Sequence, residues 1–243
     1  MKIFAIIQAG GAGGRMDVLT RERAKPALPF AGVYRLIDFP LSNLANSGIS
    51  DLWLSLQYQG ASIEEPVANG RPWDLDRIRG GLRLLMPEQG TGTEEEDGFA
   101  QGNADELFRI RDQIRNAGME LVIVLSADHV YRFDLMDAVA THRRLDAECT
   151  MVTSEVPLEE AEDHATVERG RTVVHQMPGY WRDLGQPHLD VAAHQDILVA
   201  PGSWIAGTVG RGGCGRGRPR GRLRGPRPDH DRRARQHRGN RSR

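Results

Sequence analysis

Short apolar runs recur along the first two thirds of the chain and alternate with segments of helical period. The runs are five to eight residues long, and the first, Ile3–Gln8, is rich in Ile, which is typical of strands inside a sheet. They lie at Ile3–Gln8, Leu52–Leu56, Leu121–Leu125 and Cys149–Val156. Leu121–Leu125 is the clearest, because every one of its residues is apolar, and we expect it to be a fully buried strand.

Two segments between these runs have the period of a helix. Apolar residues recur with helical spacing over Asp105–Ile114, and Gly118 follows as a C-cap. A second helix is predicted over Phe133–Leu145. Strands that alternate with helices predict an α/β domain with a mostly parallel central sheet. Ligands of such sheets bind beyond the carboxyl ends of the strands, which directs attention to the residues after Gln8 and Leu125.

Charge divides the 243-residue chain into two parts, although its formal net charge is only -1. Residues 211–243 hold 13 Arg and 2 Asp, a net charge of +11, whereas residues 1–210 hold 19 basic and 31 acidic residues, a net charge of -12. Cys214, Leu223 and Ala234 are the only hydrophobic residues of the last segment, so it cannot bury a core and we expect a disordered tail. A basic arm for nucleic acid is the alternative, but the tail lacks aromatic residues and any binding module, so we expect no nucleic-acid partner.

Composition excludes several other classes of protein. No run approaches the 18 apolar residues of a membrane-spanning helix. The apolar stretch at the start of the chain is followed at once by glycines and charged residues, so we interpret it as a first strand and not as a signal peptide. The two cysteines form no disulfide framework or metal cluster. We therefore expect a cytoplasmic protein without a membrane partner.

A glycine loop, Gly10-Gly11-Ala12-Gly13-Gly14-Arg15, follows the first predicted strand. Glycines there let backbone N–H groups approach a phosphate closely. The loop is not a Walker A motif, which ends in Gly-Lys-Ser/Thr, and Met16 stands where a dinucleotide fingerprint needs its third glycine. A tight strand-to-helix turn without a ligand remains the alternative at this point.

The wider pattern resembles the sugar-1-phosphate nucleotidyltransferases, and within them the glucose-1-phosphate adenylyltransferase family. The likeness rests on ordered motifs over residues 3–167: GGAGGRMDVLTRERAKPALPFAG, then IDFPLSN, NSGI and QYQ, and later GNAD and SADHVY. The IDFPLSN block and the QYQ triplet point to the adenylyl branch. The resemblance implies a Rossmann-like nucleotidyltransferase domain that makes ADP-glucose and pyrophosphate from ATP and glucose 1-phosphate, for glycogen biosynthesis.

The same resemblance implies site residues, each of which matches a motif of the family. Arg15 and Lys25 would contact phosphates, and Asp128 would be catalytic and would bind Mg²⁺ with Asp183 of the later Tyr-Trp-Arg-Asp motif. The residues that would line the nucleotide pocket are Gly10, Gly11, Gly13, Gln57 and Gly102. Each has a plainer alternative: Arg15 as a surface arginine, for example, or Asp128 as a helix or turn cap. We interpret His129 as structural.

The sequence departs from the family on the side of the sugar phosphate. A segment is missing between about 167 and 171, including a Glu-Lys-Pro motif, Ala165-Thr166-Val167 is altered, and Ala100 replaces a tyrosine. Residues 1–200 are therefore predicted to be a shortened nucleotidyltransferase domain, 201–210 the start of a left-handed β-helix whose single turn lacks neighbours, and 211–243 the tail. Two hypotheses remain: an active enzyme, or a nucleotide-binding homologue of weak or no activity, such as a regulatory subunit. The resemblance implies a homo-oligomer, a tetramer, which we do not expect here because the sequence shows no match to the family's C-terminal assembly domain.

Overall fold

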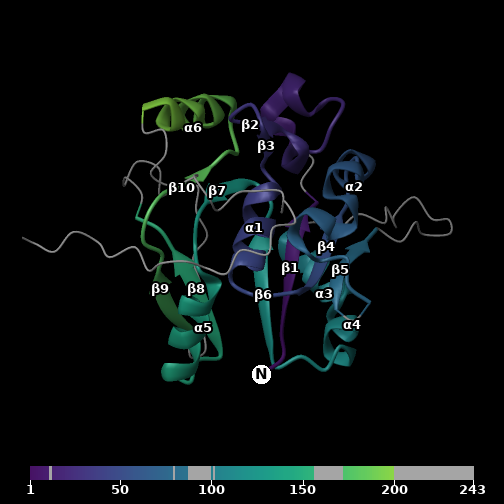
Figure 1. The fold of residues 1–243 in the computed structure, drawn as a ribbon, viewed down its shortest axis with the longest axis vertical. Helices are drawn as coiled ribbons and strands as arrows, with labels where there is room; N and C mark the ends of the chain where they lie inside the picture. Colours follow the sequence, from purple (N-terminus) through teal and green to yellow (C-terminus); the bar gives the residue numbers. More distant parts are fainter. Residues whose placement is uncertain (11–12, 79, 87–99, 101, 156–171, 200–243) are drawn as a thin grey trace, which may run out of the picture. The chain divides into compact units, whose positions relative to one another are not determined.

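A four-stranded parallel sheet carries the fold of the computed structural model (Figure 1). The structure describes residues 1–243 except 11–12, 79, 87–99, 101, 156–171 and 200–243. The strand order of the sheet is β5 (Gly81–Leu85), β4 (Asp51–Leu56), β1 (Ile3–Ala9) and β6 (Leu121–Ser126). Every pairing in it is parallel, which confirms the prediction of a mostly parallel α/β sheet.

Shorter strands and the helices surround this sheet. β7 pairs with β10 in antiparallel orientation, β8 with β9 in parallel, and β2 with β3 in antiparallel. These strands are β2 (Pro29–Phe30), β3 (Tyr34–Arg35), β7 (His129–Tyr131), β8 (Cys149–Thr153), β9 (Thr172–Gln176) and β10 (Trp181–Asp183). The helices are α1 (Asp38–Asn46), α2 (Ala61–Val67), α3 (Asn103–Arg109), α4 (Arg111–Asn116), α5 (Leu135–Arg144) and α6 (Pro187–Val199), with 3-10 helices η1 (Gly14–Thr20), η2 (Lys25–Ala27) and η3 (Ala68–Trp73).

The predicted helices form with small changes at their ends. The segment 105–114 is divided into α3 and α4 at Ile110, whose backbone leaves the helical region at φ -93° and ψ 3°. α5 begins at Leu135 because the side chain of Asp134 caps it, accepting a hydrogen bond from the backbone N–H of Met136 at 3.0 Å. Gly118 adopts a positive φ of 64° after α4, as a residue that ends a helix does.

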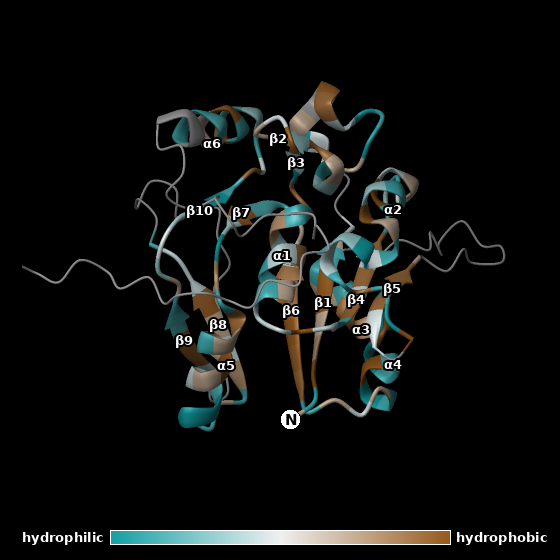
Figure 2. Ribbon diagram, viewed as in Figure 1, coloured by the Kyte–Doolittle hydropathy of each residue, from teal (hydrophilic) through white to brown (hydrophobic). Residues whose placement is uncertain are grey.

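β6 is the element for which the sequence pattern misleads. Its run of apolar residues predicted a fully buried strand, yet its side chains are only half-buried and that of Val124 is 44% exposed. The reason is position, because β6 pairs with β1 on one edge and with no other described strand. Figure 2 shows the hydrophobic character of β6 and of β8.

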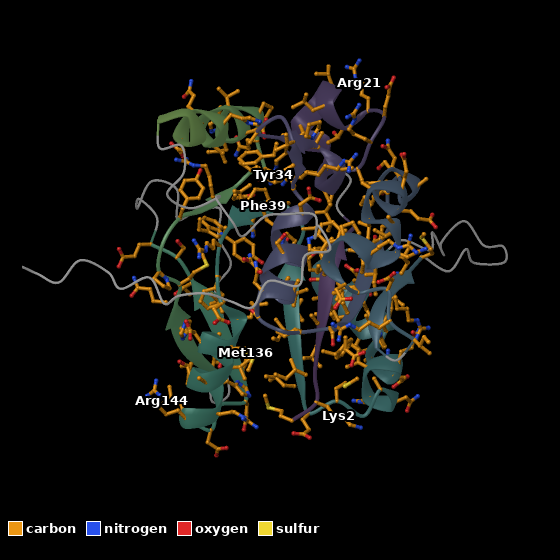
Figure 3. All side chains as sticks on the ribbon, in the orientation of Figure 1. Lys2, Arg21, Tyr34, Phe39, Met136 and Arg144 are labelled. Atoms are coloured by element: carbon orange, nitrogen blue, oxygen red, sulfur yellow. The ribbon has the colours of Figure 1, made fainter. Side chains whose placement is uncertain are left out.

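Most buried side chains gather around β1 and β4. Ile6, Ile7 and Leu54 are fully enclosed, because their strands have neighbours on both edges. A second cluster lies around Phe30 and Phe39, whose rings meet edge to face with centroids 5.4 Å apart. Tyr34 extends this cluster against Phe39, as the labels in Figure 3 show.

Several predicted features fall outside the described residues. They are the missing segment and the altered Ala165-Thr166-Val167, the β-helix turn 201–210 and the tail 211–243. Within the described part of the chain, no helix is both long and apolar enough to cross a membrane.

Asn43 provides a test of how α1 is held against β7. Its buried amide donates to the backbone oxygen of Tyr131 at 3.1 Å and accepts from the N–H of Phe133 at 3.1 Å. We expect Asn43→Ala to lower the free energy of unfolding by about 3 kcal/mol, because two buried backbone groups lose their partners. Asn116→Ala, at an exposed position of α4, should change it by less than about 0.5 kcal/mol. Urea denaturation of the two variants measures the difference, and equal effects would contradict this account.

Candidate functional site

The glycine loop leaves the carboxyl end of β1 and turns into η1. Gly13 adopts a positive φ of 63°, and its carbonyl accepts hydrogen bonds from the N–H of Met16 and from the hydroxyl of Thr20. A side chain at Gly13 would be strained and would meet Thr20 within 2.8 Å, so the turn requires glycine. Gly11 lies outside the described residues. Arg15 lies on η1 with its side chain exposed to solvent.

Gln57 connects the glycine loop to the chain ahead of α3. Its side chain packs on Gly10, where an added Cβ would lie 2.8 Å from it, and its Oε1 accepts a hydrogen bond from the N–H of Ala100 at 3.2 Å. Gly102, at φ 105°, stands immediately before α3. The structure therefore brings two of the predicted pocket residues, Gly10 and Gln57, together at the carboxyl ends of β1 and β4, and Gln57 also contacts Ala100, two residues before Gly102.

Lys25 is the charged centre of the site. Only 8% of it is exposed, and its Nζ donates to Asp128 Oδ2 at 2.8 Å and lies 3.9 Å from Asp183 Oδ1. His129 joins these residues, with Nε2 3.4 Å from Asp128 Oδ1 and 3.8 Å from Asp183 Oδ1. We call Lys25, Asp128, His129 and Asp183 the carboxylate cluster. It contains three residues predicted from the sequence and one, His129, that was interpreted as structural.

The β7–β10 pair explains how Asp183 reaches Asp128. Asp183 lies opposite His129 in the antiparallel register, so its side chain is brought beside the residue that precedes β7. The N–H of Leu184 donates to the backbone oxygen of Asp128 at 3.4 Å and extends this pairing. Trp181 lies at the other end of β10, and its ring meets that of His129 edge to face with centroids 5.1 Å apart.

The charges of the cluster keep Asp128 ionised. Burial raises the pKa of Asp128, but electrostatic interactions with His129 and Lys25, together with hydrogen bonds from Lys25 and Ser126, outweigh burial and lower the pKa to about 2.

The cluster fits a divalent cation such as Mg²⁺. Asp183 Oδ1 is buried and has no hydrogen-bond partner among the described residues, so a bound cation would satisfy this oxygen. Donor atoms of Asp128, His129 and Asp183 all lie within 4.8 Å of one another. Two carboxylates are the ligands that Mg²⁺ takes together with water and phosphate oxygens.

A buried polar group beside the pocket was not expected from the sequence. Gln8 Nε2 donates to the backbone oxygen of Asn103 at 2.8 Å and to Glu106 Oε2 at 3.0 Å. Burial raises the pKa of Glu106, while hydrogen bonds with Ser55 and Gln8 act in the opposite direction. Gln8 and Ser55 are polar residues inside otherwise apolar strands, and that interruption of the pattern is the signal that could have indicated the group.

Comparison with known proteins decides the family. Residues 4–176 match the profile of the nucleotidyl transferases. The chain belongs to the nucleotidyl transferase family. A crystal structure of a Bacillus anthracis protein, named as a glucose-1-phosphate thymidylyltransferase and bound to sucrose, shares the fold with a TM-score of 0.61 and 15% identity, over 79% of this chain and 94% of that one.

Curated relatives of the chain within the nucleotidyl transferases include proteins named glucose-1-phosphate adenylyltransferase. The chain is 41% identical over 160 residues to a glucose-1-phosphate adenylyltransferase of Clostridium acetobutylicum, covering 66% of this chain and 41% of the relative. It is 42% identical over 160 residues to one of Thermomicrobium roseum, covering 65% of this chain and 37% of the relative. The chain thus matches about two fifths of the length of these relatives.

Removal of the lysine charge tests the electrostatics of the cluster. A carboxylate whose pKa is lowered stabilises the fold fully above its unfolded pKa of about 3.9, and that stabilisation is lost as the pH falls through the folded value of about 2. Lys25→Met raises the pKa of Asp128, so it should lower the free energy of unfolding most above about pH 4, and progressively less below it.

Urea denaturation of Lys25→Met and the wild type at several pH values measures this trend. Lys2→Met is the matched control, because Lys2 is exposed and lies beside the N-terminus at the opposite ends of the strands (Figure 3). A loss of stability that does not change with pH would contradict the assigned role of Lys25.

Proposed function

We propose that this chain transfers an adenylyl group from ATP to glucose 1-phosphate, yielding ADP-glucose and pyrophosphate. The carboxylate cluster carries the proposal, because it places a buried lysine and two carboxylates at the carboxyl edge of the sheet, beside the glycine loop. The relatives named glucose-1-phosphate adenylyltransferase support the choice of ATP and glucose 1-phosphate.

The glycine loop and Gln57 would bind the nucleotide. Backbone N–H groups of a glycine turn suit the phosphates, and the side chain of Gln57 borders the pocket over Gly10. The amide of Gln57 both donates and accepts hydrogen bonds, as recognition of an adenine edge requires. Arg15 lies exposed on η1, within the turn that follows the loop, where its planar fork could hold the outer phosphates.

Asp128 and Asp183 would hold Mg²⁺, which supplies positive charge to the phosphate oxygens. In the present structure Lys25 forms an ion pair with Asp128 and lies near Asp183, so it offsets only part of the charge of the two carboxylates. With a cation on the carboxylates, Lys25 is free to exchange its ion pair with Asp128 for a phosphate oxygen. The buried position of Lys25 limits its movement, so it would hold that oxygen close to the cluster.

The transfer itself needs positioning and charge more than acid–base chemistry. A phosphate oxygen of glucose 1-phosphate forms a bond to the α-phosphorus of ATP, and the bond from that phosphorus to the bridging oxygen breaks, so that pyrophosphate leaves with the electron pair. Lys25 and Arg15 would stabilise the negative charge that gathers on the leaving pyrophosphate. The nucleophile is already an anion, so no residue has to remove a proton from it.

Nucleotide binding without transfer is the second candidate function. Lys2 is the only lysine besides Lys25, and it lies at the opposite ends of the strands, so the chain holds no lysine for the sugar phosphate. Arg182, on β10, is engaged by Asp196, with its Nη2 2.9 Å from Asp196 Oδ2. These observations bear only on binding of the sugar phosphate and do not affect the proposed binding of the nucleotide.

A pyrophosphate-release assay separates the two functions. With ATP, glucose 1-phosphate and Mg²⁺, we expect the wild type to release pyrophosphate and Asp128→Asn to be at least about a hundredfold slower, because the carboxylate charge at the cluster is lost. Asp137→Asn, at an exposed position of α5, should retain the wild-type rate. No release by the wild type above the Asp128→Asn rate would reject the transferase and leave nucleotide binding.

Glycine substitutions test the nucleotide pocket independently of catalysis. Gly10→Ala places a methyl group within 2.8 Å of the Gln57 side chain, so we expect it to weaken ATP binding by about tenfold, or about 1.4 kcal/mol. Gly60→Ala should leave binding unchanged, because Gly60 lies outside the glycine loop and an added Cβ there would be 3.4 Å from its nearest neighbour, Leu56. Titration calorimetry with ATP measures both variants. Equal affinities would place the nucleotide elsewhere.

A further inference from the structure

A buried polar contact joins β1 to the first turn of α3 and takes no part in the proposed transfer. Gln8 and Glu106 are only 7% and 5% exposed, and Gln8 Nε2 donates a hydrogen bond to Glu106 Oε2 at 3.0 Å. The same Nε2 donates to the backbone oxygen of Asn103 at 2.8 Å. A side-chain amide carries two N–H donors, so one Gln8 side chain can make both bonds. We call these two hydrogen bonds the Gln8 latch.

Gln8 is a polar residue at a strand position that buries its side chain. Residues 4–9 of β1 are all buried, and an apolar side chain at position 8 would need no hydrogen-bond partner. Burial of an amide costs free energy unless new partners replace water. Ser55 of β4 lies opposite Gln8 in the parallel register and beside the Glu106 carboxyl, so Glu106 packs over two adjacent strands. The buried amide therefore favours the one position of α3 that supplies both acceptors.

α3 has few other means of holding its place on the sheet. It is seven residues long, and no side chain caps its start. Among these seven residues, all of which the structure describes, Glu106 is the only buried one, and Phe108 is 62% exposed. A short helix is marginal by itself and is usually held by an apolar face. Because the one buried side chain of α3 is a carboxyl, the Gln8 latch fixes the start of this helix.

The chain ahead of α3 borders the proposed nucleotide pocket. The N–H of Ala100 donates to Gln57 Oε1 at 3.2 Å, and the Gln57 side chain packs on Gly10. Gly10 is two residues after Gln8, and Gly102 immediately precedes α3. The latch thus connects two borders of the pocket: the glycine loop, which leaves β1, and the chain that leads into α3.

We propose that Gln8 and Glu106 are positioning residues of the nucleotide site. They hold the chain ahead of α3 at a fixed distance from the glycine loop, and this chain in turn holds Gln57 over Gly10. They act through these neighbours and not by contact with the nucleotide. The inference rests on the proposed binding of ATP, and it assigns part of the shape of that site to a buried pair that the transfer itself does not use.

The placement of α3 can be tested without any nucleotide. Gln8→Leu keeps the size of the side chain but removes both hydrogen bonds of the latch. The backbone N–H of Glu106 donates to the oxygen of Gly102 at 3.1 Å, and we expect its hydrogen exchange to become at least about tenfold faster in this variant. Ser42→Ala is the matched control, because it removes another buried hydrogen bond, from Trp73 Nε1 at 3.0 Å, and should leave this exchange unchanged.

Titration calorimetry with ATP measures the effect on the site. We expect Gln8→Leu to weaken ATP binding by at least about tenfold, because a small displacement of the pocket borders misplaces the groups that bind the nucleotide. Ser42→Ala should lower the melting temperature, because it leaves a buried donor without its partner, and yet bind ATP as the wild type does. A loss of stability by itself therefore does not reproduce the result expected for Gln8→Leu.

Exchange of the two side chains separates positioning from a simple loss of packing. Gln8→Glu places two carboxyl groups against each other and should weaken ATP binding at least as much as Gln8→Leu. Adding Glu106→Gln to this variant restores a hydrogen bond between the two side chains with donor and acceptor reversed. The double variant should therefore recover the ATP affinity to within about threefold of the wild type.

The outcomes distinguish failure of this inference from failure of the proposed function. Wild-type affinity for ATP in Gln8→Leu, or unchanged exchange of the Glu106 amide, would overturn the inference and leave the proposed nucleotide site intact. Failure of the double variant to bind ATP better than Gln8→Glu would overturn it as well. Absence of ATP binding by the wild type would reject the proposed nucleotide site, and the inference with it.

Discussion

A buried lysine keeps its charge only where carboxylates compensate it, and this requirement organises the site. Lys25 is 103 residues from Asp128 in the sequence and more distant still from Asp183, yet all three meet at the carboxyl edge of the sheet. β1 and η2 place the lysine, β6 places Asp128, and the β7–β10 pair places Asp183. Each of these elements must be in position before the lysine meets its carboxylates, so the site depends on the whole fold.

The cluster also explains why a cation suits this position. Two carboxylates face one ammonium group, and Asp183 Oδ1 has no hydrogen-bond partner among the described residues. The carboxylates therefore outnumber the ammonium group at the point where the glycine loop would bring phosphates. A divalent cation would balance the carboxylates and the phosphates together, and the lysine would then serve the phosphates.

One edge of the parallel sheet is formed by β6, an unusually apolar strand for that position. β6 has the most apolar sequence of the sheet, but it lies at an edge and, among the described strands, pairs only with β1. Exposed strand edges promote unwanted pairing between chains, so a covering is needed.

The sequence by itself determined the class of the fold and most of the site. Apolar runs and turn glycines predicted β1, β4 and β6, because a strand inside a parallel sheet must be apolar on both faces. The motif residues Lys25, Asp128 and Asp183 were all predicted, and the structure brings them within ion-pair distance. Their roles in catalysis and in binding Mg²⁺ stay predictions.

Only the tertiary structure decided which surfaces are paired. Local pattern records how apolar a strand is but not whether a neighbour lies beside it, so the half-exposed edge of β6 was not predictable. The same holds for the contact of His129 with Asp183 and for the buried pair of Gln8 and Glu106, because the two residues of each pair are distant in the sequence. Contacts between residues so far apart depend on the packing of whole elements, and a single sequence carries no direct record of that packing.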